Sequence, residues 1–88
     1  MKLRDEFLLM PMGEEQVLVA VGKAALRFHG IVKLNDTAAF IVRQLQRETD
    51  LDKIVDAMAA EYEGTREEFA AGAEATLTQL RSIDAICE

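Results

Sequence analysis

The stretch from Gln16 to Phe28, QVLVAVGKAALRF, has the pattern of a β-hairpin and decides the fold that we expect. Its first six residues are rich in β-branched side chains and alternate with period two, as in a half-buried strand. The dipeptide Gly22-Lys23 fits the two-residue loop of a type II′ turn. Closing the hairpin there puts six apolar side chains on one face, in the pairs Val21 with Ala24, Val19 with Leu26, and Val17 with Phe28.

The neighbouring segments extend this hairpin to a three-stranded antiparallel sheet. Its second strand runs on to Leu34, with an apolar face at Phe28, Gly30, Val32 and Leu34 and another face at Ala25, Arg27, His29, Ile31 and Lys33. An earlier strand spans Glu6 to Met12, and Pro11 in it fits an edge strand or a strand end. Both faces of this earlier strand are apolar, so the pattern leaves its register open.

The residues after Leu34 have the spacing of three amphipathic helices. Asn35 can cap the first, Thr49 with Asp52 resembles a capping box for the second, and Thr65 with Glu68 is a capping box for the third. Gly64 lies where a helix C-terminus favours a positive φ. The three apolar faces are Ala38, Ile41, Val42 and Leu45; Leu51, Ile54, Val55, Met58 and Tyr62; and Phe69, Ala73, Thr76, Leu77, Leu80 and Ile83.

The order β-β-β-α-α-α predicts an α+β fold, a winged helix-turn-helix with its strands placed first. A length of 88 residues fits a single domain over residues 1–88. Half of the residues are apolar and 30% are charged, which is ordinary globular composition. A single Cys permits no intrachain disulfide, so we expect a reducing, cytoplasmic setting. No run of 18 apolar residues occurs, and we expect no membrane partner.

The sequence offers no recognisable catalytic constellation. His29 is the only His and Cys87 the only Cys, so neither a nucleophile–base pair nor a clustered metal site is apparent. No glycine-rich phosphate loop occurs either. We therefore expect a binding protein rather than an enzyme, with no metal and no cofactor.

From Leu34 to Val42 the sequence LNDTAAFIV resembles the Leu-Asn-acid-Thr/Ser-Ala-x-x-Ile signature of PqqD-like proteins, named for protein D of pyrroloquinoline quinone biosynthesis. The segment from Val19 to Gly30 resembles the hairpin of small stand-alone members, and the likeness runs from about Phe7 to Ile86. Members that serve pyrroloquinoline quinone synthesis usually carry Asp-Gly and Pro-Glu-Gly where this chain has residues 47–49 and 30–33. These departures favour the broader family over that pathway.

The resemblance implies a recognition element for ribosomally made, post-translationally modified peptides. Such a domain holds the leader of a precursor peptide and presents it to a modifying enzyme, often a radical S-adenosylmethionine enzyme. In that family the leader adds as a strand beside the third strand and packs on the third helix. The candidate peptide-binding residues are then Arg27, Phe28, His29, Gly30, Ile31, Val32 and Lys33 on the strand, and Phe69, Ala73 and Leu77 on the helix.

Two other functions fit the same elements. A winged-helix DNA-binding regulator would insert the third helix in the major groove. However, residues 35–88 carry twelve acidic and five basic side chains, a charge that repels phosphate, so we expect no nucleic-acid partner. A homodimeric interaction module would instead pair its edge strand with that of a second copy.

Overall fold

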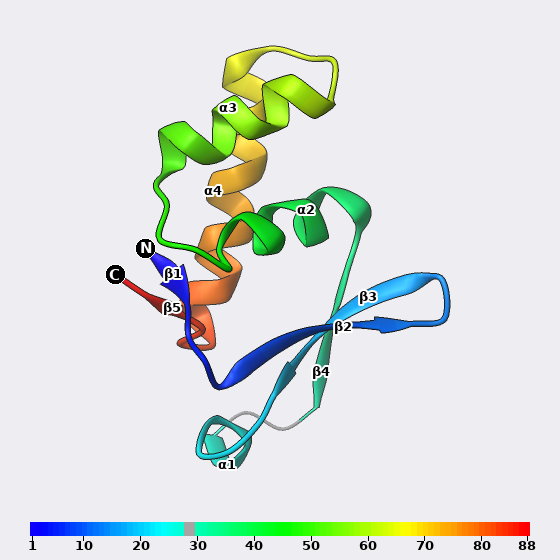
Figure 1. Ribbon diagram of the computed structural model, residues 1–88, viewed down its shortest axis with the longest axis vertical. Helices are drawn as coiled ribbons and strands as arrows, with labels where there is room; N and C mark the ends of the chain where they lie inside the picture. Colours follow the sequence, from blue (N-terminus) through cyan, green and yellow to red (C-terminus); the bar gives the residue numbers. More distant parts are fainter. Residues whose placement is uncertain (28–29) are drawn as a thin grey trace.

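The structure, a computed structural model, describes residues 1–27 and 30–88 and confirms the expected α+β class. A three-stranded antiparallel sheet precedes three helices (Figure 1). Its strands are β2 (Phe7–Met12), β3 (Glu15–Ala20) and β4 (Ile31–Leu34), in the order β2-β3-β4. The helices are α2 (Asp36–Gln44), α3 (Leu51–Glu61) and α4 (Arg66–Ser82). The sequence patterns did not indicate three short elements, β1 (Lys2–Leu3), α1 (Ala24–Arg27) and β5 (Ile86–Cys87).

The tight hairpin joins β2 to β3, so the turn predicted at Gly22-Lys23 is wrong. The pairing runs from Phe7 opposite Ala20 to Met12 opposite Glu15, which leaves a two-residue loop. The first loop residue is Gly13, with φ 65°, as a type II′ turn requires.

The chain after β3 enters a short helix instead of reversing. Gly22 has φ 61°, and α1 begins two residues later. The Glu6 carboxylate accepts a hydrogen bond of 3.0 Å from the Ala24 N–H, and Ala24 itself is buried in the core. Leu26 is consequently 77% exposed rather than part of a hairpin face. Its expected neighbour Phe28 lies outside the described residues.

The predicted pairing within residues 17–28 is replaced by two other strand contacts. Val19 lies opposite Leu8 and Ile31, and Val17 lies opposite Met10 and Lys33. The third strand is also shorter than expected, because Arg27 ends α1 and β4 starts only at Ile31.

The register assigns the two faces of the sheet differently from the sequence pattern. The inner face carries Phe7, Leu9, Pro11, Gln16, Leu18, Ala20, Val32 and Leu34, whereas the outer face carries Leu8, Met10, Met12, Glu15, Val17, Val19, Ile31 and Lys33. The placement of Val32 and Leu34 toward the core is confirmed, but Val17 and Val19 lie on the opposite face, where Val17 is still buried. Helix α2 packs against all three strands, and the three long helices lie on one side of the sheet (Figure 1).

The helices begin close to where their capping residues predict. The Asn35 side chain accepts a hydrogen bond of 2.8 Å from the Ala38 N–H, and Thr65 with Glu68 forms a reciprocal capping box. The cap of α3 is Asp50 instead of Thr49, and its carboxylate accepts a hydrogen bond of 2.9 Å from the Lys53 N–H. The predicted apolar faces meet in one core, whose fully buried helical side chains include Ile41, Val42, Leu45, Ile54, Leu77 and Leu80.

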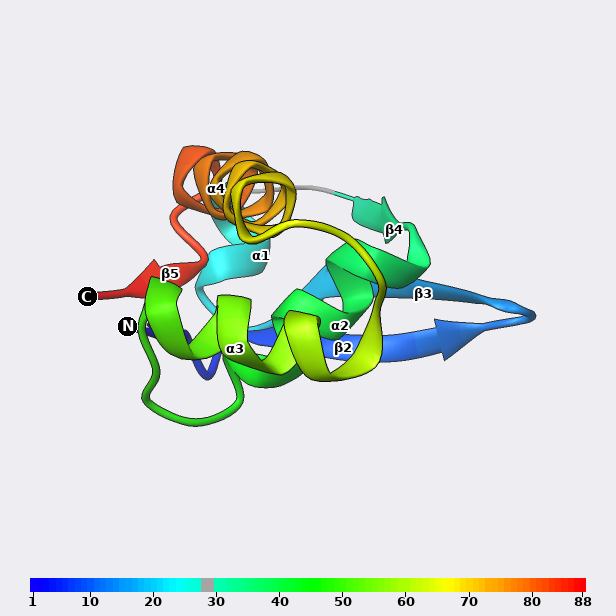
Figure 2. The same cartoon turned by 90° about the horizontal axis from the view of Figure 1, so that it is seen from above.

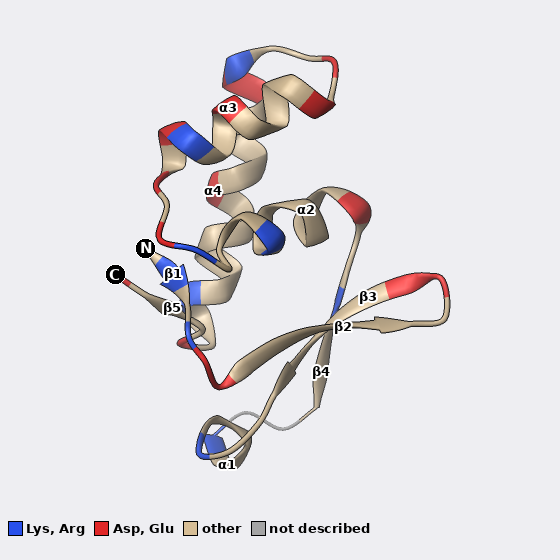
Figure 3. Ribbon diagram, in the orientation of Figure 1, with Lys and Arg blue, Asp and Glu red and all other residues tan. Residues whose placement is uncertain are grey.

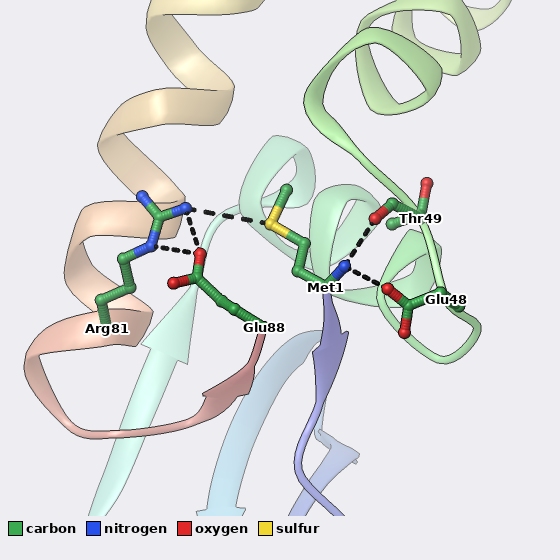
Figure 4. A network of polar contacts seen from close by, with 5 residues as sticks. All are labelled: Met1, Glu48, Thr49, Arg81 and Glu88. Carbon is green, nitrogen blue, oxygen red and sulfur yellow. Dashed lines mark hydrogen bonds and ion pairs between the residues drawn. The ribbon is translucent and has the colours of Figure 1, made fainter.

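The N-terminus contacts the loop between α2 and α3, and the C-terminus contacts α4. The Met1 ammonium contacts the Glu48 carboxylate and donates a hydrogen bond of 2.8 Å to the Thr49 carbonyl (Figure 4). Arg81 of α4 pairs with Glu88 at 2.7 Å, and its guanidinium also reaches the Met1 sulfur. Together with the antiparallel β1–β5 pairing, these contacts close the end of the core away from the hairpin tip.

Gly64 and Gly72 form a matched pair for a test of the helical half. A Cβ at Gly64 would lie 3.1 Å from the Phe69 ring, and Gly64 has φ 154°. We expect Gly64→Ala to lower the free energy of unfolding by about 1–3 kcal/mol. Gly72 lies inside α4 with open space around it, so Gly72→Ala should raise that free energy by about 0.5–1 kcal/mol. Urea unfolding of both variants measures the two effects, and equal shifts would contradict this geometry.

Candidate functional site

The open edge of the sheet is β4. Its partner β3 occupies one side, and within the described residues no strand pairs with its other side. The opposite edge, β2, contains Pro11, which has no N–H to donate. An unpaired edge without proline can accept another strand. The structure therefore offers β4 as the better of its two edges for strand addition.

The free side of β4 faces the same side of the molecule as α4. In the view from above, the strands follow one another in the order β2, β3, β4, and α4 lies on the β4 side of the molecule, opposite β2 (Figure 2). A strand added to β4 would therefore run next to α4. This placement agrees with the geometry that the resemblance implies.

The predicted strand residues that are described lie at or beside this edge. Ile31 is 42% exposed, Val32 is half-buried, and Lys33 is exposed with its ammonium 4.0 Å from the Glu15 carboxylate. Gly30 lies just before β4 instead of within a strand, and its φ of 105° suits glycine. Arg27 is exposed at the end of α1. Phe28 and His29 lie outside the described residues.

The predicted helix residues lie deeper than the edge. Phe69, Ala73 and Leu77 are 8%, 0% and 1% exposed and belong to the core. These three side chains pack α4 onto the core, and their contact with a peptide stays a prediction.

The half-buried residues beside this stripe are Ala70 on one flank of α4 and Gly72 with Thr76 on the other. Ala70 lines a shallow pocket with Leu51 and Val55 of α3, so the flank of Gly72 and Thr76 is the one turned away from α3. The sequence pattern did not single out Gly72, although a glycine inside a helix costs stability and is a reason to look for a packing role.

Charge separates the helices from the sheet. Acidic side chains are spread over the helical part, whereas the three-stranded sheet is nearly free of charge except near the hairpin tip and at Lys33 (Figure 3). Both arginines of α4 are already in ion pairs, Arg66 with Asp56 at 2.7 Å and Arg81 with Glu88 at 2.7 Å. The open edge strand β4 thus carries Lys33 and no acidic residue of its own, while Glu14, Glu15 and Asp36 lie around its C-terminal end.

Within residues 1–27 and 30–88, no cluster of three His, Cys, Asp or Glu side chains could hold a metal ion. No helix in the same ranges has the length and apolar character needed to cross a membrane.

A small winged helix-turn-helix domain with an open sheet edge beside its last helix is the class defined by this geometry. The sequence profile described as "Coenzyme PQQ synthesis protein D (PqqD)" matches residues 15–86. The chain therefore belongs to the PqqD family, and the predicted resemblance is confirmed. A search of curated proteins finds no match.

Two solved structures share the fold over nearly the whole chain. One is described as "TbiB1 in Complex with the TbiA(beta) Leader Peptide", at 22% identity and TM-score 0.77, covering 97% of this chain and 93% of that one. The other is "Lasso peptide synthetase B1 complexed with the leader peptide", at 25% identity and TM-score 0.77, covering 99% and 96%.

Proposed function

We propose that this chain is a non-catalytic adaptor that binds the leader of a ribosomally made precursor peptide and presents the peptide to a modifying enzyme. The observation that carries this proposal is the free edge of β4 next to α4. Two fold relatives whose titles name a bound leader peptide support it.

Strand addition to β4 supplies affinity through main-chain hydrogen bonds and selectivity through side-chain pockets. Alternate side chains of the added strand lie beside the outer face of β4, where Ile31 favours an apolar neighbour and Lys33 an acidic one. The other side chains point toward α4. A net binding free energy of about −8 kcal/mol gives micromolar affinity, which suits an adaptor that must release its client.

The charges of α4 favour this adaptor over a DNA-binding regulator. The helix carries Glu67, Glu68 and Glu74, and the ion pairs of Arg66 and Arg81 engage both of its cations. A recognition helix needs cations free to neutralise phosphates. We therefore expect no binding to duplex DNA at physiological salt.

The test is calorimetric titration with a precursor peptide encoded next to the gene for this chain, together with amide chemical-shift mapping. We expect micromolar binding and shifts concentrated on residues 30–34 and the flank of α4 at Gly72 and Thr76. Shifts confined to α2, with residues 30–34 unmoved, would refute strand addition even if the peptide binds. No binding at all would refute the adaptor function.

A bulky side chain at Gly72 should block the peptide without unfolding the chain. The space around Gly72 is open, and a helical Leu costs less than Gly in propensity. We expect Gly72→Leu to weaken peptide binding at least about tenfold, comparable with a lost close contact at an interface. Ala71→Leu is the matched control, since Ala71 is exposed on the next position of α4. Equal titration curves for the two variants would place the peptide elsewhere.

A further inference from the structure

The outer face of the sheet is an apolar surface that peptide binding to the edge leaves uncovered. The register arranges its side chains in cross-strand rows: Leu8, Val19 and Ile31 in the first, Met10, Val17 and Lys33 in the second, and Met12 with Glu15 in the third. Six of these eight side chains are apolar. The outer face of an antiparallel sheet is normally polar, so this composition needs a reason.

Val17 at the centre of this face is 1% exposed and Val19 is half-buried, but the four apolar side chains around them are exposed. Leu8, Met10, Met12 and Ile31 are 42–49% exposed, and they are four of the six large exposed apolar residues in the described part of the chain. The other two, Leu26 and Tyr62, lie on helix α1 and at the end of α3. Contiguous exposed apolar surface of this kind commonly marks a site of protein contact.

We propose that the peptide-modifying enzyme docks on this outer face, and that the bound leader forms one edge of the docking surface. The proposal rests on the adaptor function proposed above. Because β4 contributes Ile31 and Lys33 to the outer face and also carries the open edge, a leader strand on β4 would widen the same face. The enzyme would then contact the adaptor and the peptide through one continuous surface.

The size of the face favours a transient partner over a second copy of the chain. Three strands of up to six residues cover about 20 Å by 14 Å. Stable complexes bury about 800 Å² on each partner, more than twice this face. A symmetric dimer could use only the face itself, whereas an enzyme also gains contact with the peptide strand beside it.

The charges of this chain indicate the surface that the enzyme would present. The two charged side chains of the outer face are Glu15 and Lys33. The Lys33 ammonium lies 4.0 Å from the Glu15 carboxylate, so their charges cancel. The helical part is strongly acidic (Figure 3). An apolar centre with a basic rim would therefore complement this chain.

The test compares a double variant, Leu8→Ser with Met10→Ser, to the control Leu26→Ser. All three side chains are exposed, but Leu26 lies on α1 and outside the sheet. The probe is the purified modifying enzyme encoded beside this chain, titrated with and without saturating precursor peptide. We expect the double variant to bind the enzyme at least about tenfold more weakly, as when two contact residues at the centre of an interface are truncated. Its affinity for the peptide, and both affinities of Leu26→Ser, should match those of the wild type.

Other outcomes would overturn the proposal. Unchanged enzyme binding by a folded double variant would do so. A wild-type dimer in sedimentation that the double variant abolishes would assign the face to a second copy. Failure of the wild type to bind the peptide would refute the adaptor function, and that titration needs no enzyme. If the double variant does not fold, the enzyme is instead titrated into the labelled wild-type chain and the amide chemical shifts are mapped. The proposal requires shift changes at residues 8–12 and 31, and their absence would refute it.

Discussion

Leu18→Asp should leave the chain unfolded at room temperature, whereas Leu26→Asp should melt like the wild type. Leu18 is fully buried on the inner face, between Leu9 and Val32 in its row. An unpaired carboxylate there costs on the order of 5 kcal/mol, which matches the whole stability of a small domain. Leu26 is 77% exposed, so a carboxylate there stays in water. Circular dichroism and thermal melting of the two variants measure the difference.

This pair of variants distinguishes the observed sheet from the hairpin that the sequence pattern favours. A hairpin turning at Gly22-Lys23 would bury Leu26 and leave Leu18 on the opposite face, so it would reverse the two results. A native spectrum and an unchanged melting temperature for Leu18→Asp would show that the observed register is wrong.

The helices could be predicted because their signals are local. Asn35 and the Thr65–Glu68 box cap helices within four residues of sequence, and the apolar spacing that follows them is long enough to be unambiguous. The observed cap of α3 lies one residue after the predicted one, because Thr49 and Asp50 are both good capping residues. Asp50 supplies the cap, while the carbonyl of Thr49 accepts from the Met1 ammonium.

The hairpin could not be predicted because two Gly-X dipeptides compete for it. Gly13-Glu14 and Gly22-Lys23 carry the same local signal, and both glycines have positive φ. The choice depends on α1, whose first N–H is held by Glu6 from 18 residues away. No local pattern contains that contact.

The strand faces could not be predicted for a related reason. Val17, Leu18, Val19 and Ala20 are apolar on both parities, so alternation does not say which face meets the helices. The same ambiguity in β2 reflects a real property of the fold, since Leu8, Met10 and Met12 lie on the exposed outer face. The edge position of the third strand was nevertheless predictable, because three antiparallel strands in chain order leave the third at the edge.

N-methylation of alternate residues of the leader peptide should weaken binding in one phase and spare it in the other. An added strand directs the N–H of every second residue toward β4 and the others away. A methyl group on an inward N–H removes a ladder donor and occupies the gap of about 4.8 Å between strands. Each lost hydrogen bond is worth about 0.5–1.5 kcal/mol, so two inward methyl groups should weaken binding by about 5- to 150-fold. Calorimetric titration of the two peptides against the wild-type chain measures this.

The peptide methylated in the outward phase is the matched control, because it has the same composition and loses no contact with β4. Its affinity should stay within about threefold of the unmodified leader, since its methyl groups replace only exposed N–H groups. Equal losses in both phases would indicate a helical or irregular bound peptide, and no loss in either would exclude main-chain pairing. A clear difference between the phases would require an extended peptide paired along one side, and β4 is the edge of this sheet that has no proline.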